Sequence, residues 1–460
     1  MAVEMRRKAG ITLAACAALV LAGTAGAAWA YADDEGQPVG SWNEPADGPR
    51  TPVAAEQLAP GALPVDPALP AVPRTTVLAP EPTGTVTRHV PEAAVVPVGR
   101  QRVGELVQVR RLIKYAAGQR RVTFRYPGAS YVKLHFNRLS MMPGEYLTVS
   151  SADGKEKYRY NAPDVLTTTP ADRWAMSVTG DTAVLDVHKG AAKLPAAGPV
   201  LARLGVGVDR AARGFSRAEQ RRQPERQIVA SARSGREESV CGLDTSADAV
   251  CYKSADPVAY TKSKAIARLL INGTELCTGW RIGGKNRMIT NNHCLTTSAE
   301  AYDTEVWFNY QCATCGGFKV FQPTKVWGDK VLATDHLYDY TLFTVDNFAS
   351  IKKFGYLQLD TARPARGQEL YVPQHPAGEP TRIAGSLGEK AGNCAVASAG
   401  YPGYAPTSDV SYYCDTEGGS SGSPVISRAT DKVVALHHFG GCPNSGVRGD
   451  LLAAKLRRYL

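Results

Sequence analysis

The sequence predicts a mainly β protein in which a small antiparallel β-sandwich precedes a larger all-β domain. Short runs of alternating apolar residues recur from about residue 90 onward, and Gly, Pro, Asn and Asp turn signals separate them. None of the ten cysteines lies between Cys16 and Cys241, so disulfides are expected only in the C-terminal part. With 460 residues the chain has room for two or three domains.

Residues 1–32 have the pattern of a secretory signal peptide. Arg6 to Lys8 form a basic head, Ile11 to Ala22 an apolar run, and Ala28-Trp29-Ala30 a small-residue cleavage site. A lipoprotein anchored through Cys16 is the alternative. The apolar run is too short for a stable membrane span and no later stretch is long enough. We therefore expect an extracellular protein without stable membrane insertion.

Residues 33–87 are rich in Pro, Ala and Gly and are expected to form a disordered or polyproline-like spacer. Residues 88–195 then carry the strands of the β-sandwich. The expected strands are Val122–Tyr126, Val132–Phe136, Tyr146–Val149, Tyr158–Tyr160, Ala175–Val178 and Ala183–Val187. His135, Asp181 and His188 have no motif spacing and are expected to have ordinary surface or core roles.

Residues 196–236 are dense in arginine and carry much of the formal net charge of +10. No aromatic residues are interleaved in its densest arginine runs, Arg210–Arg213 and Arg221–Arg226, as a single-strand nucleic-acid surface would need, so no nucleic-acid partner is expected. The segment is instead predicted to be a solvated linker or helix open to proteases.

Three stretches of the C-terminal part carry side chains suited to nucleophilic catalysis. Ser421 lies in the Gly- and Ser-rich run from Cys414 to Pro424, which read by itself could equally be a simple turn. A serine nucleophile needs an imidazole base that a carboxylate orients. His293 directly follows an apolar strand, and Asp339 lies where a strand of alternating apolar residues begins.

In the order His, Asp, Ser these stretches resemble the triad motifs of the chymotrypsin-like serine peptidases, most closely the bacterial lysyl and glutamyl (V8-type) endopeptidases. The resemblance implies that Ser421 is the nucleophile, His293 the general base and acid, and Asp339 the group that fixes the imidazole tautomer. It also implies an oxyanion hole from the N–H groups of Gly419 and Ser421. For residues 237–460 it implies two packed six-stranded antiparallel barrels, and no cofactor or metal.

Two departures from the family pattern stand out. Asn291-Asn292 replaces the usual Ala-Ala before the histidine, and Ser420 replaces the usual Asp before the nucleophile. Animal trypsins become active when a new N-terminal amine pairs with that aspartate. Maturation of this chain must therefore work differently.

The cysteines match the lysyl endopeptidase pattern independently of the triad. The resemblance implies the bridges Cys277–Cys294, Cys241–Cys442 and Cys251–Cys315, and elimination adds Cys394–Cys414. Cys312 is left over and could replace Cys315, and the Cys312-x-x-Cys315 spacing is also that of a zinc or redox pair.

The bridge from Cys241 would hold the N-terminus of the peptidase domain covalently. A cut near Arg236 would release the preceding part, with Arg213 or Arg226 as alternative sites.

Substrate preference remains open in the sequence. Asp415 lies six residues before Ser421, where a pocket carboxylate selects Lys or Arg in trypsin, but it could equally bond nearby loop N–H groups. His437 and His438 resemble the strand whose histidine binds a P1 glutamate in glutamyl endopeptidases. Gly440 and Gly441 suit the close approach of a substrate backbone.

We expect a secreted, monomeric serine endopeptidase that acts on proteins or peptides. The β-sandwich is expected to be a prodomain that aids folding and blocks the cleft, or else a retained binding module. One rival class is a serine esterase with Ser420 as nucleophile, followed by Asp431 and His437. Another is a protease-like binding protein, which predicts a damaged triad.

Overall fold

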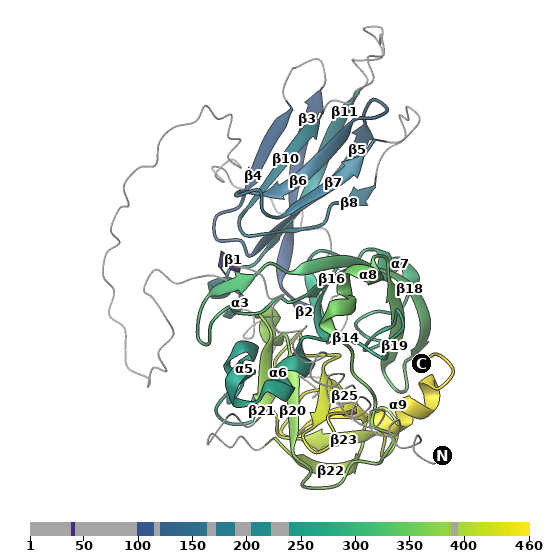
Figure 1. Ribbon diagram of the computed structural model, residues 1–460. Coiled ribbons are helices and arrows are strands. Elements are labelled where there is room, and N and C mark those ends of the chain that lie inside the picture. Colours follow the sequence, from purple (N-terminus) through teal and green to yellow (C-terminus); the bar gives the residue numbers. More distant parts are fainter. Residues whose placement is uncertain are drawn as a thin grey trace, which may run out of the picture.

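The computed structural model describes residues 38–41, 99–114, 120–162, 172–188, 204–221, 239–385, 387 and 394–460. The expected signal peptide and the candidate cut sites Arg226 and Arg236 lie outside these residues. Within them the protein is mainly β, as the sequence predicts, with a sandwich at one end and two barrels at the other (Figure 1).

The β-sandwich consists of two antiparallel sheets. One has the order β4-β10-β6-β7, and the other the order β3-β11-β5-β8, with β9 also paired to β5. The strands are β3 (Gly104–Lys114), β4 (Arg121–Arg125), β5 (Tyr131–Ser140), β6 (Tyr146–Ser151), β7 (Lys157–Asn161), β8 (Arg173–Trp174), β9 (Val178–Thr179), β10 (Thr182–His188) and β11 (Gly205–Gly214). Leu134, Phe136, Leu147, Leu185 and Val208 are among the buried side chains that fill the space between the sheets.

The expectation of a solvated linker at residues 196–236 is wrong for residues 205–214. These residues form β11, the inner strand that pairs with both β3 and β5. Small and apolar residues such as Val206, Val208 and Ala211 alternate into the core, while Arg213 pairs with Glu105 on β3 and with Glu219 beyond the strand. Burial of one face overrides the charged composition. Arg213 therefore lies inside a sheet rather than in a linker open to proteases.

A second departure concerns the expected spacer. Within residues 33–87, strand β1 (Pro38–Ser41) pairs antiparallel with β17 (Lys319–Phe321).

The first barrel of the larger domain is closed. Its strands follow the order β13-β16-β18-β19-β15-β14, and pairing of β13 with β14 closes the ring. They are β13 (Ile266–Ile271), β14 (Glu275–Arg281), β15 (Met288–Thr290), β16 (Glu305–Phe308), β18 (Thr324–Asp335) and β19 (Tyr340–Val345). Strand β2 (Gln101–Arg102) adds to β14 from the segment before the sandwich.

The second barrel is built from β20-β24-β25-β26-β23-β22, with β21 and β12 continuing the sheet beyond β20. Its ring closes through backbone hydrogen bonds between residues 367–370 and 394–396, for example from Leu370 N to Cys394 O at 2.9 Å. The strands are β12 (Ala247–Asp248), β20 (Leu370–Gln374), β21 (Arg382–Gly385), β22 (Val396–Tyr401), β23 (Asp409–Tyr412), β24 (Pro424–Ser427), β25 (Val433–Phe439) and β26 (Asn444–Arg448).

Short helices lie around the strands. They are α3 (Arg217–Arg221), α5 (Tyr252–Ala255), α6 (Pro257–Ser263), α7 (Ser298–Tyr302), α8 (Phe348–Ile351) and α9 (Gly449–Leu456), with 3-10 turns η2 (Ala249–Cys251), η3 (Lys352–Phe354) and η4 (Pro376–Gly378). None of the helices in the described ranges is long and apolar enough to cross a membrane.

Candidate active site

The loop that carries Ser421 is fixed between the two barrels. Thr278 N on β14 donates to Ser421 O at 2.9 Å, and the Thr278 hydroxyl donates to Gly419 O at 2.9 Å. On the other side Gly422 N donates to His437 O on β25, also at 2.9 Å. Gly419 has φ 98°, and a Cβ built on it would lie 2.6 Å from Leu276 Cδ2, so the loop requires glycine there.

His293 and Asp339 form a tightly bonded pair. His293 follows β15 and Asp339 precedes β19, so pairing of these two strands brings the side chains together. The Asp339 carboxylate accepts from His293 Nδ1 at 2.8 Å and from His293 N at 3.0 Å. Asn291, one of the two departures from the family pattern, donates through Nδ2 to Asp339 O at 2.9 Å. It thus helps to hold Asp339 at its positive φ of 39°.

Asp339 also bonds a second histidine, His438, which the sequence predicted as a candidate for substrate binding. His438 lies between two buried carboxylates, with Nδ1 3.1 Å from Asp339 Oδ2 and Nε2 2.7 Å from Asp409 Oδ2. Burial alone would lower the pKa of His438, but the bonds to Asp339 and Asp409 outweigh burial and raise it to about 9.

For Asp339 itself burial would raise the pKa. The charge of His293 and the hydrogen bonds from His293 and His438 instead hold it well below its ordinary value. Asp339 is therefore a carboxylate throughout the physiological range.

The nitrogen of His293 that faces away from Asp339 is covered. Nε2 is buried, and among the described residues it has no hydrogen-bond partner. A Cβ built on Gly99 would lie 2.6 Å from this atom, which places the backbone at Gly99 directly against the imidazole edge. The arrangement has the orientation of a general base, but the proton-accepting atom is covered by the chain itself.

Asp415 is engaged by the first residues of the larger domain. Its carboxylate accepts from Cys241 N at 3.0 Å and from Thr245 N and Oγ1 at 2.8 and 2.7 Å. The sequence left two roles open for Asp415, selecting a basic substrate residue or bonding nearby loop N–H groups. These contacts are of the second kind. A carboxylate can accept about four hydrogen bonds, and that of Asp415 accepts three. Binding of a substrate side chain by Asp415 therefore stays a prediction.

His437 is fully buried on β25, with Nδ1 2.6 Å from the Tyr412 hydroxyl. Burial and the charges of His438 and His293 lower the pKa of His437 to about 3, which leaves it neutral. The following Gly440 and Gly441 end β25 beside the Cys241–Cys442 bridge.

Glu417 was not predicted from the sequence as a residue of the site. It lies four residues before Ser421, and burial together with nearby Glu379 and Asp244 raises its pKa to about 7. A carboxyl near its titration point beside a nucleophile is a typical functional signal. Its position between Asp415 and Ser421 was the available clue.

The disulfides are Cys241–Cys442, Cys251–Cys315, Cys277–Cys294 and Cys394–Cys414, as expected, and the buried Cys312 is not part of these bridges. Ligand atoms of Cys277, His293 and Cys294 lie within 4.8 Å of one another. The two sulfurs are bonded to each other, so this group lacks the thiolates that a metal would need.

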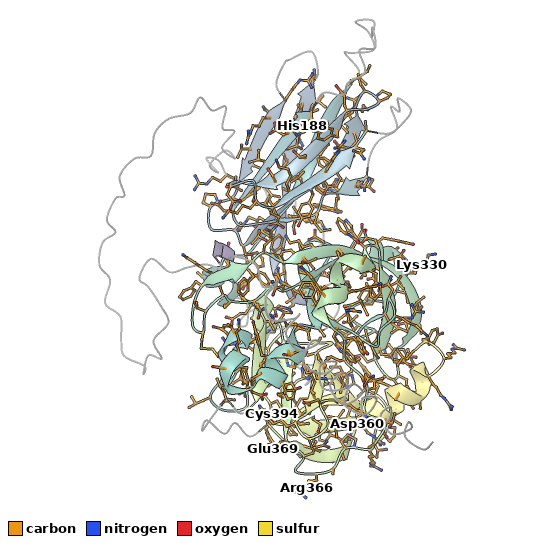
Figure 2. The ribbon with its side chains drawn as sticks, in the orientation of Figure 1. His188, Lys330, Asp360, Arg366, Glu369 and Cys394 are labelled. Carbon is orange, nitrogen blue, oxygen red and sulfur yellow. A yellow bond between two sulfur atoms is a disulfide. The ribbon has the colours of Figure 1, made fainter. Side chains whose placement is uncertain are left out.

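The remaining candidates do not converge. His188 on β10 bonds Thr148 and lies in the sandwich, away from the barrels (Figure 2). His135 is held by Asp209 and Asp172, and Asp181 pairs with Arg125, so each has a local role.

The esterase reading fails on topology, because strand β24 rather than a helix follows the Gly-Gly-Ser-Ser-Gly loop.

Comparison with known proteins agrees with this geometry. Residues 277–436 match the family described as the trypsin-like peptidase domain. Over 227 residues the chain is 41% identical to Secreted RxLR effector protein 73 of Plasmopara viticola, a match that covers 46% of this chain and 54% of that protein. It is 31% identical over 199 residues to the uncharacterized protein y4fB of Sinorhizobium fredii, which covers 39% of this chain and 28% of that protein. The chain thus spans about half or less of the length of these relatives.

Solved structures similar to this chain are peptidases. A Glu endopeptidase aligns with a TM-score of 0.35 at 20% identity, covering 48% of this chain and 98% of that one. A serine endoprotease from Yersinia pestis aligns with a TM-score of 0.33 at 11% identity, covering 45% of this chain and 66% of that one. The match to the trypsin-like peptidase domain covers residues 277–436, which lie within the two-barrel part of the chain.

Proposed function

We propose that the chain is a secreted serine endopeptidase that cleaves through Ser421, His293 and Asp339. The observation that carries this proposal is the His293–Asp339 pair, with Nδ1 2.8 Å from Oδ2, beside a glycine-rich loop that β14 and β25 hold in place. The basic and apolar pattern of residues 1–32 supports secretion.

In the proposed reaction His293 Nε2 takes the Ser421 hydroxyl proton as Oγ attacks the carbonyl carbon of the substrate. The N–H groups of Gly419 and Ser421 stabilise the oxyanion, and His293 returns its proton to the leaving amine. Water then attacks the acyl-enzyme and loses its proton to His293, which passes it to Ser421 Oγ as the bond between Oγ and the acyl carbon breaks. Asp339 keeps the Nδ1 proton in place throughout.

For the residue before the cut bond we propose a preference for Lys or Arg. Asp415 and Glu417 put two carboxyl groups within six residues of Ser421, and the nearby Glu379 and Asp244 both pair with Arg382. An acidic side chain would be repelled there, and neutral His437 offers no compensating charge. Preference for glutamate through His437 is the rival, since imidazole N–H groups can donate to a carboxylate.

We also propose that the β-sandwich is a prodomain that inhibits the enzyme until maturation. Its Lys133 forms a fully buried ion pair with Glu305 of the first barrel, at 2.9 Å, so the sandwich docks on the peptidase domain through a specific interface. The segment that leads into the sandwich lies at His293.

Cleavage-site profiling of a denatured protein mixture with the secreted, matured form tests the function, with Ser421→Ala as control. We expect cuts after Lys and Arg that the control lacks. Glu417→Gln should weaken that preference while leaving the anchor at Asp415 intact. Cuts after Glu would transfer the specificity to His437, and cuts no more numerous than with Ser421→Ala would refute the peptidase function.

A further inference from the structure

The segment before the sandwich enters the catalytic region as an added β-strand. Gln101 and Arg102 of β2 pair antiparallel with Leu276 and Glu275 of β14, and Val103 N donates to Thr274 O at 2.8 Å. Strand β14 is the strand that holds the nucleophile loop through Thr278. Strand β2 is therefore added to β14 beside that loop, in the way that an extended peptide adds to a strand edge.

The first residue of this segment covers the catalytic histidine. Gly99 has φ 99°, and its missing Cβ would lie 2.6 Å from both Cδ2 and Nε2 of His293. Only glycine fits so close to the ring. Since His293 Nε2 is buried and has no hydrogen-bond partner among the described residues, the atom that must receive the serine proton is occluded.

The next residue is clamped by two carboxylates. Arg100 has a side chain only 3% exposed, with its guanidinium nitrogens 2.8 Å from Glu275 and 2.8 Å from Glu300. Its Nε donates to His293 O at 3.0 Å. Burial would raise the pKa of Glu300, but hydrogen bonds from Thr296 and Arg100 lower it to about 2, so the clamp is charged. Planar, multidentate recognition of this kind favours arginine over lysine.

Gln101 and Val103, further along the segment, fit the same surface. Gln101 packs against the nucleophile loop, where its Oε1 lies 2.0 Å from the position of a Cβ built on Gly418. Val103 is fully buried with Leu276, Trp307 and Tyr310. The segment is thus fitted along its length from His293 to the interface with the sandwich.

We propose that Glu275, Glu300 and the carbonyl of His293 form a guanidinium-binding subsite beside the catalytic histidine. The chain's own Arg100 fills it, so that residues 99–103 act as an intramolecular inhibitor. The subsite is expected to bind a peptide in which an arginine follows the residue that packs against the His293 ring, as Arg100 follows Gly99. This inference rests on the proposed function and names the regulation of that same site.

Labelling of Ser421 by a fluorophosphonate tests the inference in the full-length, uncut chain, which a gel separates from processed forms. Arg100→Ala should speed labelling about tenfold or more, because the clamp that holds Gly99 on His293 is lost. Arg110→Ala is the matched control, since that exposed arginine lies on β3, outside residues 99–103. Ser421→Ala gives the background.

A peptide of residues 96–104 provides a second measurement within one chain, so differences in folding between chains do not enter. Added to the Arg100→Ala chain, it should slow labelling, and the same peptide with Arg100→Ala should not. Equal labelling rates for the uncut wild type and Arg100→Ala would overturn the inhibitor while leaving the peptidase function standing. Absence of labelling in every chain, with no cleavage by the secreted form, would refute the proposed function itself.

Discussion

Single residues here serve two partners at once, and Asp339 is the clearest case. Its buried carboxylate orients His293 and also bonds His438, which in turn bonds Asp409. A protonated His438 neutralises part of the charge of two buried carboxylates that would otherwise be costly. We therefore expect His438 to act as a positioning residue through Asp339, whereas the sequence suggested that one of His437 and His438 binds substrate.

This network predicts a pH-dependent stability. The pKa of His438 is raised from 6.5 to about 9 in the folded chain, so its stabilising effect is full below pH 6.5 and is lost as the pH rises through 9. The free energy of unfolding of the wild type should fall by up to ~3 kcal/mol across this range relative to His438→Gln. Chemical unfolding at a series of pH values measures the difference, and a difference that stays constant with pH would contradict the assignment.

The same substitution has a kinetic readout that a merely structural role would not move. His438→Gln removes a positive charge that shares Asp339 with His293. The acid limb of the pH profile of Ser421 labelling should therefore move to higher pH in the matured enzyme. If the acid limb stays at the same pH and the labelling rate is lower at every pH, the substitution has damaged the structure instead.

At the scale of elements, β14 organises the catalytic centre. One strand carries Cys277, which bridges to Cys294 next to His293, and Thr278, which bonds the nucleophile loop. Its first two residues receive β2. The strand therefore couples the histidine, the serine loop and the inhibiting segment.

Thr278→Val should loosen the serine loop. The hydroxyl of Thr278 donates to Gly419 O and accepts from His375 N, and valine leaves both buried backbone groups unpaired at a cost of about 1–3 kcal/mol. Labelling of Ser421 in the matured form should slow, and the melting temperature should fall. Thr278→Ser keeps the hydroxyl and should restore both. Equal loss in the two variants would mean that the methyl packing, rather than the hydrogen bonds, matters.

At the scale of the whole molecule, the sandwich and the peptidase domain share a buried interface. Glu305 of β16 pairs with Lys133 and accepts from Ser177 of the sandwich, and Lys325 pairs with Glu156 at 2.6 Å. Burial raises the pKa of Glu305, but Lys133 and Lys325 lower it further, so the carboxylate stays charged. Four buried charges divided between two domains make their docking specific.

Lys133→Met should weaken that docking strongly. It leaves Glu305 with one fewer cation in a fully buried site, which costs about 3–5 kcal/mol. Thermal unfolding of the full chain should show a lowered transition, and limited proteolysis should release the sandwich earlier. Lys114→Met, an exposed lysine on β3, is the control and should change neither. An unshifted transition in Lys133→Met would show that the two domains do not depend on this pair.

Local sequence pattern determined much of this protein. Alternating apolar runs predicted β4, β5, β6, β7 and β10 of the sandwich, because a half-buried sheet needs a period of two. The expected strand Ala175–Val178 is wrong for residues 175–177, and β3 and β11 were not predicted. The motifs around His293, Asp339 and Ser421 marked the catalytic stretches, since the side chains that act in catalysis lie in short, distinctive segments. Cysteine placement and the resemblance led to the disulfides, whose partners lie up to 201 residues apart.

Only the tertiary structure decided what each charge does. Arginine-rich residues 205–214 read as a linker, yet burial between β3 and β5 makes them an inner strand. Asp415 and His438 were candidate substrate ligands, and each bonds a residue far away in the sequence, 170 and 99 positions distant. The block on His293 was invisible for the same reason: Gly99 and Arg100 have no motif, and their meaning depends on contacts some 175 to 200 residues distant. Sequence records periodicity and local chemistry, whereas the partner of a charged group is fixed by packing.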